Sequence, residues 1–326
     1  MPGMRKVDAV RSWYGKYVNA PRYKKPAETL QLRTVDGIKL HAVRLHGPEG
    51  CAATVVLSHG FANWHRHPKI HEFATKLAQH VNVIVLDLRG HGKSEGISTL
   101  GAYEWLDVQA AVEQVPENDA LILLGTSMGS GASVIYAGMA GRGLAARTAD
   151  AVIAVSGPAW WGGRDAARGV GRVLELAASP FMRAALKYLM RVRIAGPGRD
   201  GRIDPVTVVG DISPAPLVII HDKADWYFGP DQVEAMVSAA GPNAQLWWRE
   251  GGHATDLFNK DLLEQILWDV IVPVVAMKQL EGDGLQRDGG TGSGVLPEVL
   301  VEADAAVVLD DKPAPLDVAH TPVLGS

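Results

Sequence analysis

The stretch from Leu121 to Gly131, LILLGTSMGSG, decides how this chain is interpreted. An apolar run leads into Gly125-Thr126-Ser127-Met128-Gly129, and small residues that can begin a helix follow. Gly-x-Ser-x-Gly between a strand and a helix is typical of a sharp turn that exposes the serine hydroxyl. Its glycines are needed because side chains at those positions would strike neighbouring backbone. The stretch predicts Ser127 as a nucleophile; the alternative is a serine that only caps the following helix.

The general base should follow Ser127 along the chain, because a nucleophile on such a turn is followed by an acid and then a histidine. His320 lies in a tail rich in Pro and Asp, and His221 directly ends the apolar run Pro216–Ile220, which leaves no room for a preceding acid. His253 remains, in a loop with two glycines after another apolar run. The sequence predicts His253 as the base; the alternative is a surface histidine that caps the next helix.

Two acids, Asp222 and Asp225, follow the strand expected to precede the base. The triad acid must hold the tautomer of the histidine ring, so it must reach back over the end of the sheet. We favour Asp225, because a residue a few positions beyond the strand can curl back. Asp222, at the strand end, is expected to bond its own backbone in an Asx turn.

The run Val55–Ala62, VVLSHGFA, predicts a strand that leads into the loop supplying one oxyanion donor. The second donor is the N–H of the residue after the nucleophile. We therefore expect the backbone N–H groups of Phe61 and Met128 to form an oxyanion hole. His59 precedes Ser127 and is expected to shape the loop.

With Asp87–Gly96, DLRGHGKSEG, these motifs resemble the α/β-hydrolase superfamily over roughly residues 30 to 275. The branch most similar is the monoacylglycerol-lipase-like esterase and serine-peptidase-like one, although Thr126 stands where relatives often have His. The resemblance implies a serine hydrolase that cleaves carboxylic esters through an acyl-enzyme, without cofactor or metal. The alternatives are a thioesterase, peptidase or acyltransferase with the same triad, or a ligand-binding or sensing module of the same fold.

The alternation of strands and helices predicts the α/β-hydrolase fold, with a mostly parallel central sheet flanked by helices. A hairpin is expected at residues 30–45, and the core should comprise residues 27–157 and 214–278. Residues 158–213 interrupt this alternation of strands and helices after the strand at 151–156, and they are expected to form a helical cap or lid. The strands are expected at 53–58, 82–87, 120–125, 151–156, 216–220 and 244–249, and the helices at 68–80, 103–115, 129–140, 230–240 and 257–277.

Tryptophans are the candidate substrate-binding residues. Trp160 and Trp161 lie at the start of the expected cap and could line the binding site for an acyl chain or aromatic ester. A pair of tryptophans is as often the core of a cap. Trp64 and Trp226, near the expected oxyanion loop and acid, are further candidates.

The charge is unevenly distributed along the 326 residues, although the formal net charge is only −4. Residues 1–25 hold seven bases and one acid, whereas the residues from Lys278 onward hold nine acids and three bases. We expect residues 1–26 to form a basic segment and 279–326 to form a disordered acidic tail. The basic segment could instead contact an anionic membrane or lipid aggregate. The negative net charge argues against nucleic-acid binding. The sequence does not indicate an oligomeric state.

A cytoplasmic location is expected, because the chain has one cysteine, Cys51, and its start lacks the apolar region of a signal peptide. Its apolar runs are also too short for a membrane span. The cluster His65, His67 and His71 is expected to form a polar loop and not a metal site, since triad chemistry requires no metal. His91 is expected to be structural.

Overall fold

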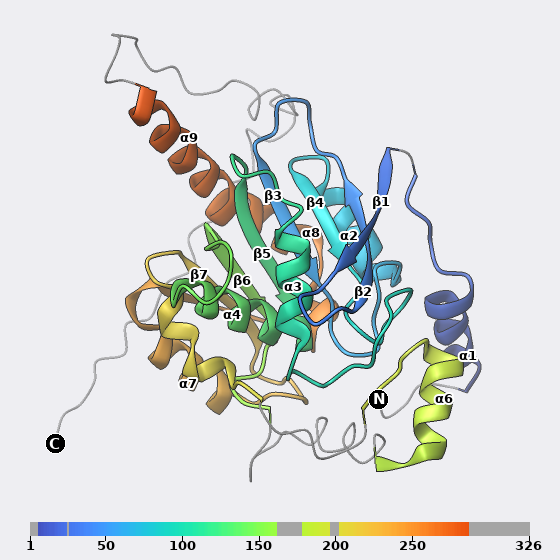
Figure 1. Cartoon of the computed structure of the whole chain (residues 1–326). Coiled ribbons are helices and arrows are strands. Elements are labelled where there is room, and N and C mark those ends of the chain that lie inside the picture. The colour runs from blue at the N-terminus through green and yellow to red at the C-terminus, as the bar shows by residue number, and fades with distance from the viewer. Residues whose placement is uncertain (1–5, 25, 162–177, 196–201, 287–326) are drawn as a thin grey trace, which may run out of the picture. The chain divides into compact units, whose positions relative to one another are not determined.

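The computed structural model describes residues 6–24, 26–161, 178–195 and 202–286. In this part of the chain an eight-stranded sheet has the order β1-β2-β4-β3-β5-β6-β7-β8 (Figure 1). β1 pairs antiparallel with β2, and β2 with β4, while every other neighbouring pair is parallel. The strands are β1 Ala27–Arg33, β2 Lys39–Leu45, β3 Ala53–Ser58, β4 Asn82–Leu86, β5 Ala120–Thr126, β6 Ala151–Val155, β7 Leu217–Asp222 and β8 Ala244–Arg249.

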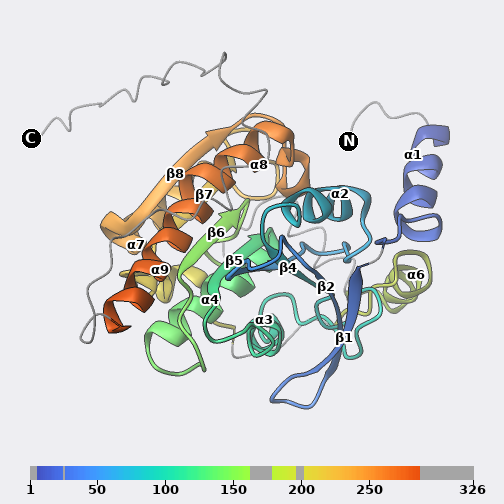
Figure 2. The same ribbon diagram turned by 90° about the horizontal axis from the view of Figure 1, so that it is seen from above.

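The central strands are apolar throughout because helices cover both faces of the sheet. Successive residues of β3 point to opposite faces, so that Val56 packs in one hydrophobic core and Val55 and Leu57 pack in the other. α3, α4 and α7 cover the first face, and α2, α8 and α9 cover the second (Figure 2). These helices are α2 Pro68–Leu77, α3 Glu104–Val112, α4 Met128–Gly141, α7 Pro230–Ala240, α8 Lys260–Ile266 and α9 Val272–Gln286.

The predicted fold class, the hairpin and the strand–helix alternation are confirmed. The helix expected from residue 257 instead begins at Lys260, because Asn259 caps it by accepting the N–H of Leu262 at 2.8 Å. Ala254–Leu257 is a separate 3₁₀ turn. A π-helical turn, Leu267–Ile271, joins α8 to α9, which continues beyond the core boundary expected at 278.

The described part of the insertion after β6 contains helix α6, Pro180–Met190, and two 3₁₀ turns, Pro205–Thr207 and Val209–Ile212. Leu186 of α6 packs with Val192, Ile194, Phe61 and Ala62, which brings α6 to the loop after β3. Residues 162–177 and 196–201 of the expected cap lie outside the described residues. So do residues 1–5 and 287–326, which include most of the expected acidic tail and His320.

The N-terminal segment contains α1, Lys6–Trp13, and a π-helical turn, Tyr14–Val18. The indole N–H of Trp13 donates a 2.8 Å hydrogen bond to the carbonyl oxygen of Leu189 in α6. α1 and α6 lie side by side in both views (Figures 1 and 2). Within the described ranges, no helix has the length and apolar character needed to cross a bilayer.

Candidate active site

Ser127 stands at the turn between β5 and α4 in a strained backbone conformation, with φ of 52° and ψ of −118°. Such a conformation is rare for a residue with a side chain. It is typical of the nucleophile elbow, the sharp turn between a strand and a helix that exposes a serine hydroxyl. A Cβ on Gly125 would lie 2.4 Å from the carbonyl oxygen of Gly129. A Cβ on Gly129 would lie 2.4 Å from the carbonyl oxygen of Ser58, at the end of β3. Both glycines are therefore required by close backbone approach, as the motif predicts.

Three side chains from the carboxyl ends of different strands form a continuous hydrogen-bonded chain. Nε2 of His253 lies 2.8 Å from Oγ of Ser127, and Nδ1 of His253 lies 2.7 Å from Oδ2 of Asp225. An ionised carboxylate only accepts hydrogen bonds, so Nδ1 carries the proton and Nε2 is free to accept from the serine hydroxyl. The geometry therefore allows His253 to take the Ser127 proton. Among the described residues, the hydrogen bonds of His221 and Asp222 go to other partners: His221 bonds the carbonyl oxygen of Phe228, and Asp222 accepts backbone N–H groups.

The carboxylate of Asp225 is fixed by backbone groups. Its Oδ1 accepts the N–H of Tyr227 at 2.7 Å and that of Phe228 at 3.2 Å, which leaves Oδ2 directed at His253. The Asp225 side chain is fully buried. Burial among fixed donors keeps one carboxylate oxygen in place for the imidazole ring.

Asp222 forms the Asx turn expected of it, because its Oδ1 accepts the N–H of Ala224 at 2.8 Å. It also has a role that the sequence does not indicate. Its Oδ2 accepts the N–H groups of Gly251 and Gly252, at 2.8 and 2.7 Å. Asp222 therefore holds the backbone of the loop that leads into His253, whereas Asp225 bonds the ring of His253 itself.

Sequence reasoning missed two further residues at this site. Oγ of Ser156, directly after β6, accepts the N–H of Ala254 at 2.9 Å and so anchors the far side of His253. The Tyr227 ring lies 4.3 Å from the His253 ring, centroid to centroid. In the sequence, Tyr227 is marked only by its position two residues after the predicted acid. Ser156 is marked only by its position at the end of a strand.

The loop after β3 passes directly over the nucleophile. A Cβ on Gly60 would lie 3.0 Å from the Cβ of Ser127. The N–H of Phe61 has no hydrogen-bond acceptor among the residues with described positions, and Met128 is the first residue of α4, so its N–H has no acceptor within that helix. Both predicted oxyanion donors thus belong to segments in contact with Ser127.

A model of the "Alpha/beta hydrolase family" matches residues 55–286, which is more than half of the chain. The chain belongs to the alpha/beta hydrolase family.

Solved structures with this fold include several esterases. Pf2001 of Pyrococcus furiosus has a TM-score of 0.53 at 21% sequence identity, over 83% of this chain and 98% of that one. A thermophilic esterase of Thermogutta terrifontis, with malate bound, has a TM-score of 0.55 at 19% identity, over 76% of this chain and 99% of that one. RhEst1 of Rhodococcus sp. ECU1013 has a TM-score of 0.55 at 17% identity, over 73% and 97% of the two chains. At these identities the similarity establishes the fold of this alpha/beta hydrolase.

The N-terminal segment, which precedes the matched residues of this alpha/beta hydrolase, is hydrogen-bonded to the loop after β3. The hydroxyl of Tyr17 donates to the carbonyl oxygen of Ala62 at 2.6 Å, and that of Tyr23 donates to the carbonyl oxygen of His65 at 2.7 Å. In the reverse direction, the Trp64 indole donates to the Lys16 carbonyl oxygen at 2.9 Å. Nε of Arg66 donates to the Pro21 carbonyl oxygen at 2.6 Å. We call residues 13–23 the N-terminal clasp.

His59 and His91 support the same loop from inside. Nδ1 of His59 bonds the carbonyl oxygen of Gly60 at 2.8 Å, while its Nε2 accepts the N–H of Leu88 at 3.1 Å. His91 accepts the N–H of Ala62 at 3.2 Å. Burial lowers the pKa of His59 to about 3 and that of His91 to about 4, so both rings are neutral at pH 7. These contacts agree with the loop-shaping role predicted for His59 and the structural one predicted for His91.

The histidine cluster predicted as a polar loop is mostly buried. Among the described residues, one group of three potential metal ligands comes together, with ligand atoms of His41, His65 and Asp87 all within 4.8 Å of one another. Asp87 accepts the N–H and Nδ1–H of His65, at 2.7 and 2.8 Å, and the N–H of Lys93 at 3.0 Å. Burial alone would raise the Asp87 pKa, but the bonds from His65 hold it at about 2. This carboxylate therefore serves as a hydrogen-bonded support for the loop.

The four candidate tryptophans lie in different environments. Trp64 is buried under the clasp, and Trp161 is buried with its indole N–H donating to the Ile203 carbonyl oxygen at 2.8 Å. Trp160 is half-buried against the core that contains α4, and Trp226 is exposed next to Asp225. Only Trp160 and Trp226 present surface to a molecule approaching from solvent.

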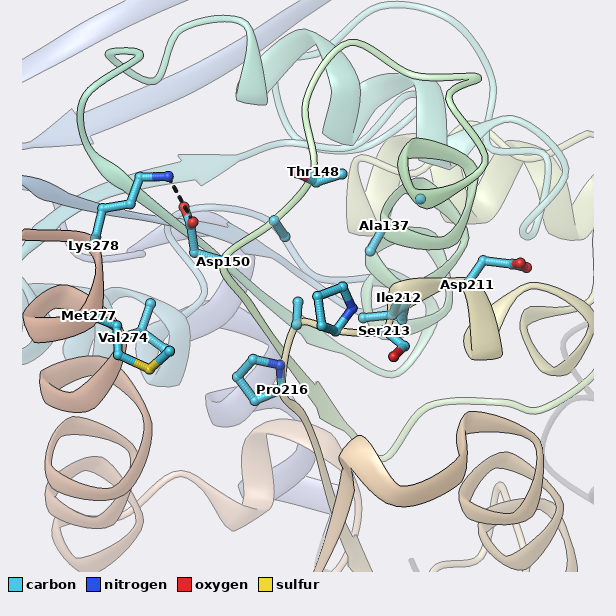
Figure 3. Close-up of a pocket in the computed structure, with 14 residues that line it drawn as sticks. Ala137, Thr148, Asp150, Asp211, Ile212, Ser213, Pro216, Val274, Met277 and Lys278 are labelled. Carbon is cyan, nitrogen blue, oxygen red and sulfur yellow. Dashed lines mark hydrogen bonds and ion pairs between the residues drawn. The ribbon is translucent and has the colours of Figure 1, made fainter. Parts of the chain in front are cut away.

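A cavity of about 310 Å³ lies where β6 and β7 begin, beside the carboxyl-terminal part of α4 (Figure 3). Its wall includes the ion pair between Asp150 and Lys278, whose atoms are 2.9 Å apart. None of the predicted site residues lines it. Because Ser127 follows the opposite, carboxyl end of β5, this cavity is separate from the candidate active site.

Proposed function

We propose that this protein is a serine hydrolase that cleaves carboxylic esters through a Ser127–His253–Asp225 triad. The single observation that carries the proposal is the unbroken chain of hydrogen bonds from Asp225 through His253 to Ser127, with distances of 2.7 and 2.8 Å. The esterase activity named for several structures of this fold supports the same reaction class.

In the proposed reaction, Oγ of Ser127 attacks the ester carbonyl while Nε2 of His253 takes its proton. The N–H groups of Phe61 and Met128 stabilise the oxyanion. His253 then returns the proton to the leaving alkoxide, and the alcohol departs. A water molecule, activated by the same nitrogen, hydrolyses the acyl-enzyme and regenerates Ser127.

The proposed substrates are small to medium lipophilic esters, including acylglycerol-like ones. The apolar side chains of Leu186, Val192 and Ile194 next to Phe61 support this choice, since they place a hydrophobic cluster beside the proposed oxyanion loop. Trp160 and Trp226 are proposed to contact substrate. A thioesterase, peptidase or acyltransferase would use the same triad on a different acyl donor or acceptor.

We also place the reaction in the cytoplasm, which the single cysteine supports. Contact of residues 1–25 with a lipid surface belongs to the same proposal, and the exposure of Val10, Tyr14 and Val18 supports it.

The test is labelling with a fluorophosphonate probe, followed by hydrolysis of p-nitrophenyl esters with acyl chains from two to sixteen carbons. Ser127→Ala should abolish both labelling and turnover. Ser133→Ala is the matched control, because Ser133 is a buried serine of the adjoining helix whose hydroxyl bonds no described residue. Labelling that persists in Ser127→Ala would overturn the assignment, and labelling without ester turnover would favour another acyl acceptor or a binding module.

A further inference from the structure

Exposed apolar side chains gather on α1 with its following π-helical turn and on α6. Of the fourteen large hydrophobic residues exposed in the described part of the chain, six lie on these two neighbouring segments. The six are Val10, Tyr14, Val18, Phe181, Tyr188 and Leu189. Phe181 and Tyr188 are 79% and 77% exposed, and exposed apolar side chains that gather in one region of a protein mark an interaction surface.

The spacing shows that these residues form faces of their helices. Val10, Tyr14 and Val18 recur every four residues, and Phe181 and Tyr188 are seven apart, so each set lies on one side of its helix. The opposite side of α6 packs on the protein, because Leu186 is buried against the proposed oxyanion loop. A helix that is apolar on both sides normally has both sides covered.

The charges around this surface are almost all positive. Residues 8–24 and 178–195 contain eight Lys or Arg residues and one acid, Asp8. Arg11, Lys187 and Arg191 are exposed there. Apolar aromatic side chains surrounded by basic ones are the composition that binds in the headgroup region of an anionic bilayer.

We propose that α1, its π-helical turn and α6 together form a docking surface for an anionic lipid bilayer. The surface joins two segments distant in sequence, fastened by the hydrogen bond from Trp13 to Leu189. Because α6 also packs on Phe61, docking brings the lipid surface to the side of the molecule that carries the proposed oxyanion loop. The proposal extends the lipid contact of residues 1–25 and does not depend on the proposed reaction.

The test uses full-length Ser127→Ala protein, which cannot turn over lipid, and sedimentation with two kinds of vesicle. One kind is phosphatidylcholine alone, and the other contains a third phosphatidylglycerol. The protein should bind the anionic vesicles and much less to the neutral ones, and added salt should weaken binding because the charges are exposed. Arg11→Glu with Lys187→Glu should reduce partitioning about tenfold or more, given the contribution of each basic residue near such a surface.

Phe181→Ser with Tyr188→Ser should also abolish most of the binding and leave the fold unchanged, because both rings are exposed. Trp268→Ser with Lys260→Glu is the matched control, since it removes an exposed aromatic residue and a base from a different part of the chain. Equal loss in the control, or no preference for anionic vesicles, would overturn the proposal. So would a concentration-dependent dimer that Phe181→Ser with Tyr188→Ser dissociates, because the surface would then be covered by a second copy of the chain.

Discussion

The hydroxyl of Tyr17 donates a 2.6 Å hydrogen bond to the carbonyl oxygen of Ala62, which joins the N-terminal clasp to the residue after the proposed oxyanion donor Phe61. Ala62 has a φ of 59°, so the loop is held in a conformation that an unsupported alanine would seldom adopt. The bond therefore ties residues outside the matched family region to the geometry over Ser127.

Tyr17→Phe should lower kcat about five- to tenfold while KM changes less than twofold, because the oxyanion donor is used most in the transition state. The unfolding free energy should fall by about 1 kcal/mol. Steady-state kinetics on a p-nitrophenyl ester and urea unfolding would measure both. Tyr14→Phe is the control, since Tyr14 is exposed on the same segment. Equal kcat in Tyr17→Phe and the native protein would show that the clasp does not position the loop.

Asp225→Asn should be far more damaging than Asp222→Asn. Loss of the triad carboxylate in serine proteases costs about 10⁴ in kcat, because the histidine adopts the wrong tautomer. Asp222→Asn leaves the contact between Asp225 and His253 in place but has only one acceptor oxygen. It therefore loses either the bond from Ala224 or both bonds from Gly251 and Gly252, at a cost of about 1–3 kcal/mol in stability. Activity measured below the melting temperature of each variant separates the two effects. The reverse ranking would transfer the acid role to Asp222.

Trp160 and Trp161, at the start of the expected cap, should respond differently to replacement. The Trp161 ring packs so closely on Gly131 that a Cβ there would lie 2.6 Å from it, and Trp161→Ala should cost about 3–5 kcal/mol of stability. Trp160→Ala should have the smaller effect on the melting temperature and should shift the preferred acyl chain length. Measuring the ester-length profile of each single variant tests this. An unchanged profile in Trp160→Ala would remove it from the substrate site.

Acid should destabilise this protein already between pH 7 and pH 5. The pKa values of the buried His59 and His91 are lowered to about 3 and about 4, against 6.5 when unfolded, so the unfolded state binds more protons in this window. Stability is therefore present above pH 6.5 and is lost as the pH falls towards 4. Each ring should contribute a loss of roughly 2 kcal/mol between pH 7 and pH 5.

Urea unfolding at the two pH values measures this loss. His91→Gln removes one titrating ring, so the difference between pH 7 and pH 5 should shrink by roughly 2 kcal/mol in that variant. His46→Gln is a suitable control, since His46 is half exposed at the surface. An equal pH dependence in native protein and His91→Gln would contradict the account.

The sequence by itself determined the sheet and the elbow. Continuous apolar runs such as Val55–Leu57 are typical of central strands covered on both faces. Gly125 is required by backbone contact within the turn that carries Ser127, and the motif also places Gly129, whose contact is with Ser58 at the end of β3. The sequence also places Ser127, Asp225 and His253 after successive apolar runs, which are the strands β5, β7 and β8. These features depend on short-range patterns, which a sequence states directly.

Only the tertiary structure decided which distant segments support the proposed site. Nothing in the local sequence of Tyr17 indicates a bond to Ala62, forty-five residues away, and nothing near Asp222 indicates that it holds Gly251 and Gly252. Likewise, Trp64 and Trp160 look alike in sequence, yet one is buried beneath the clasp and the other is half-buried. Burial and hydrogen-bond partners depend on how separate elements pack, and that packing is a property of the whole folded chain.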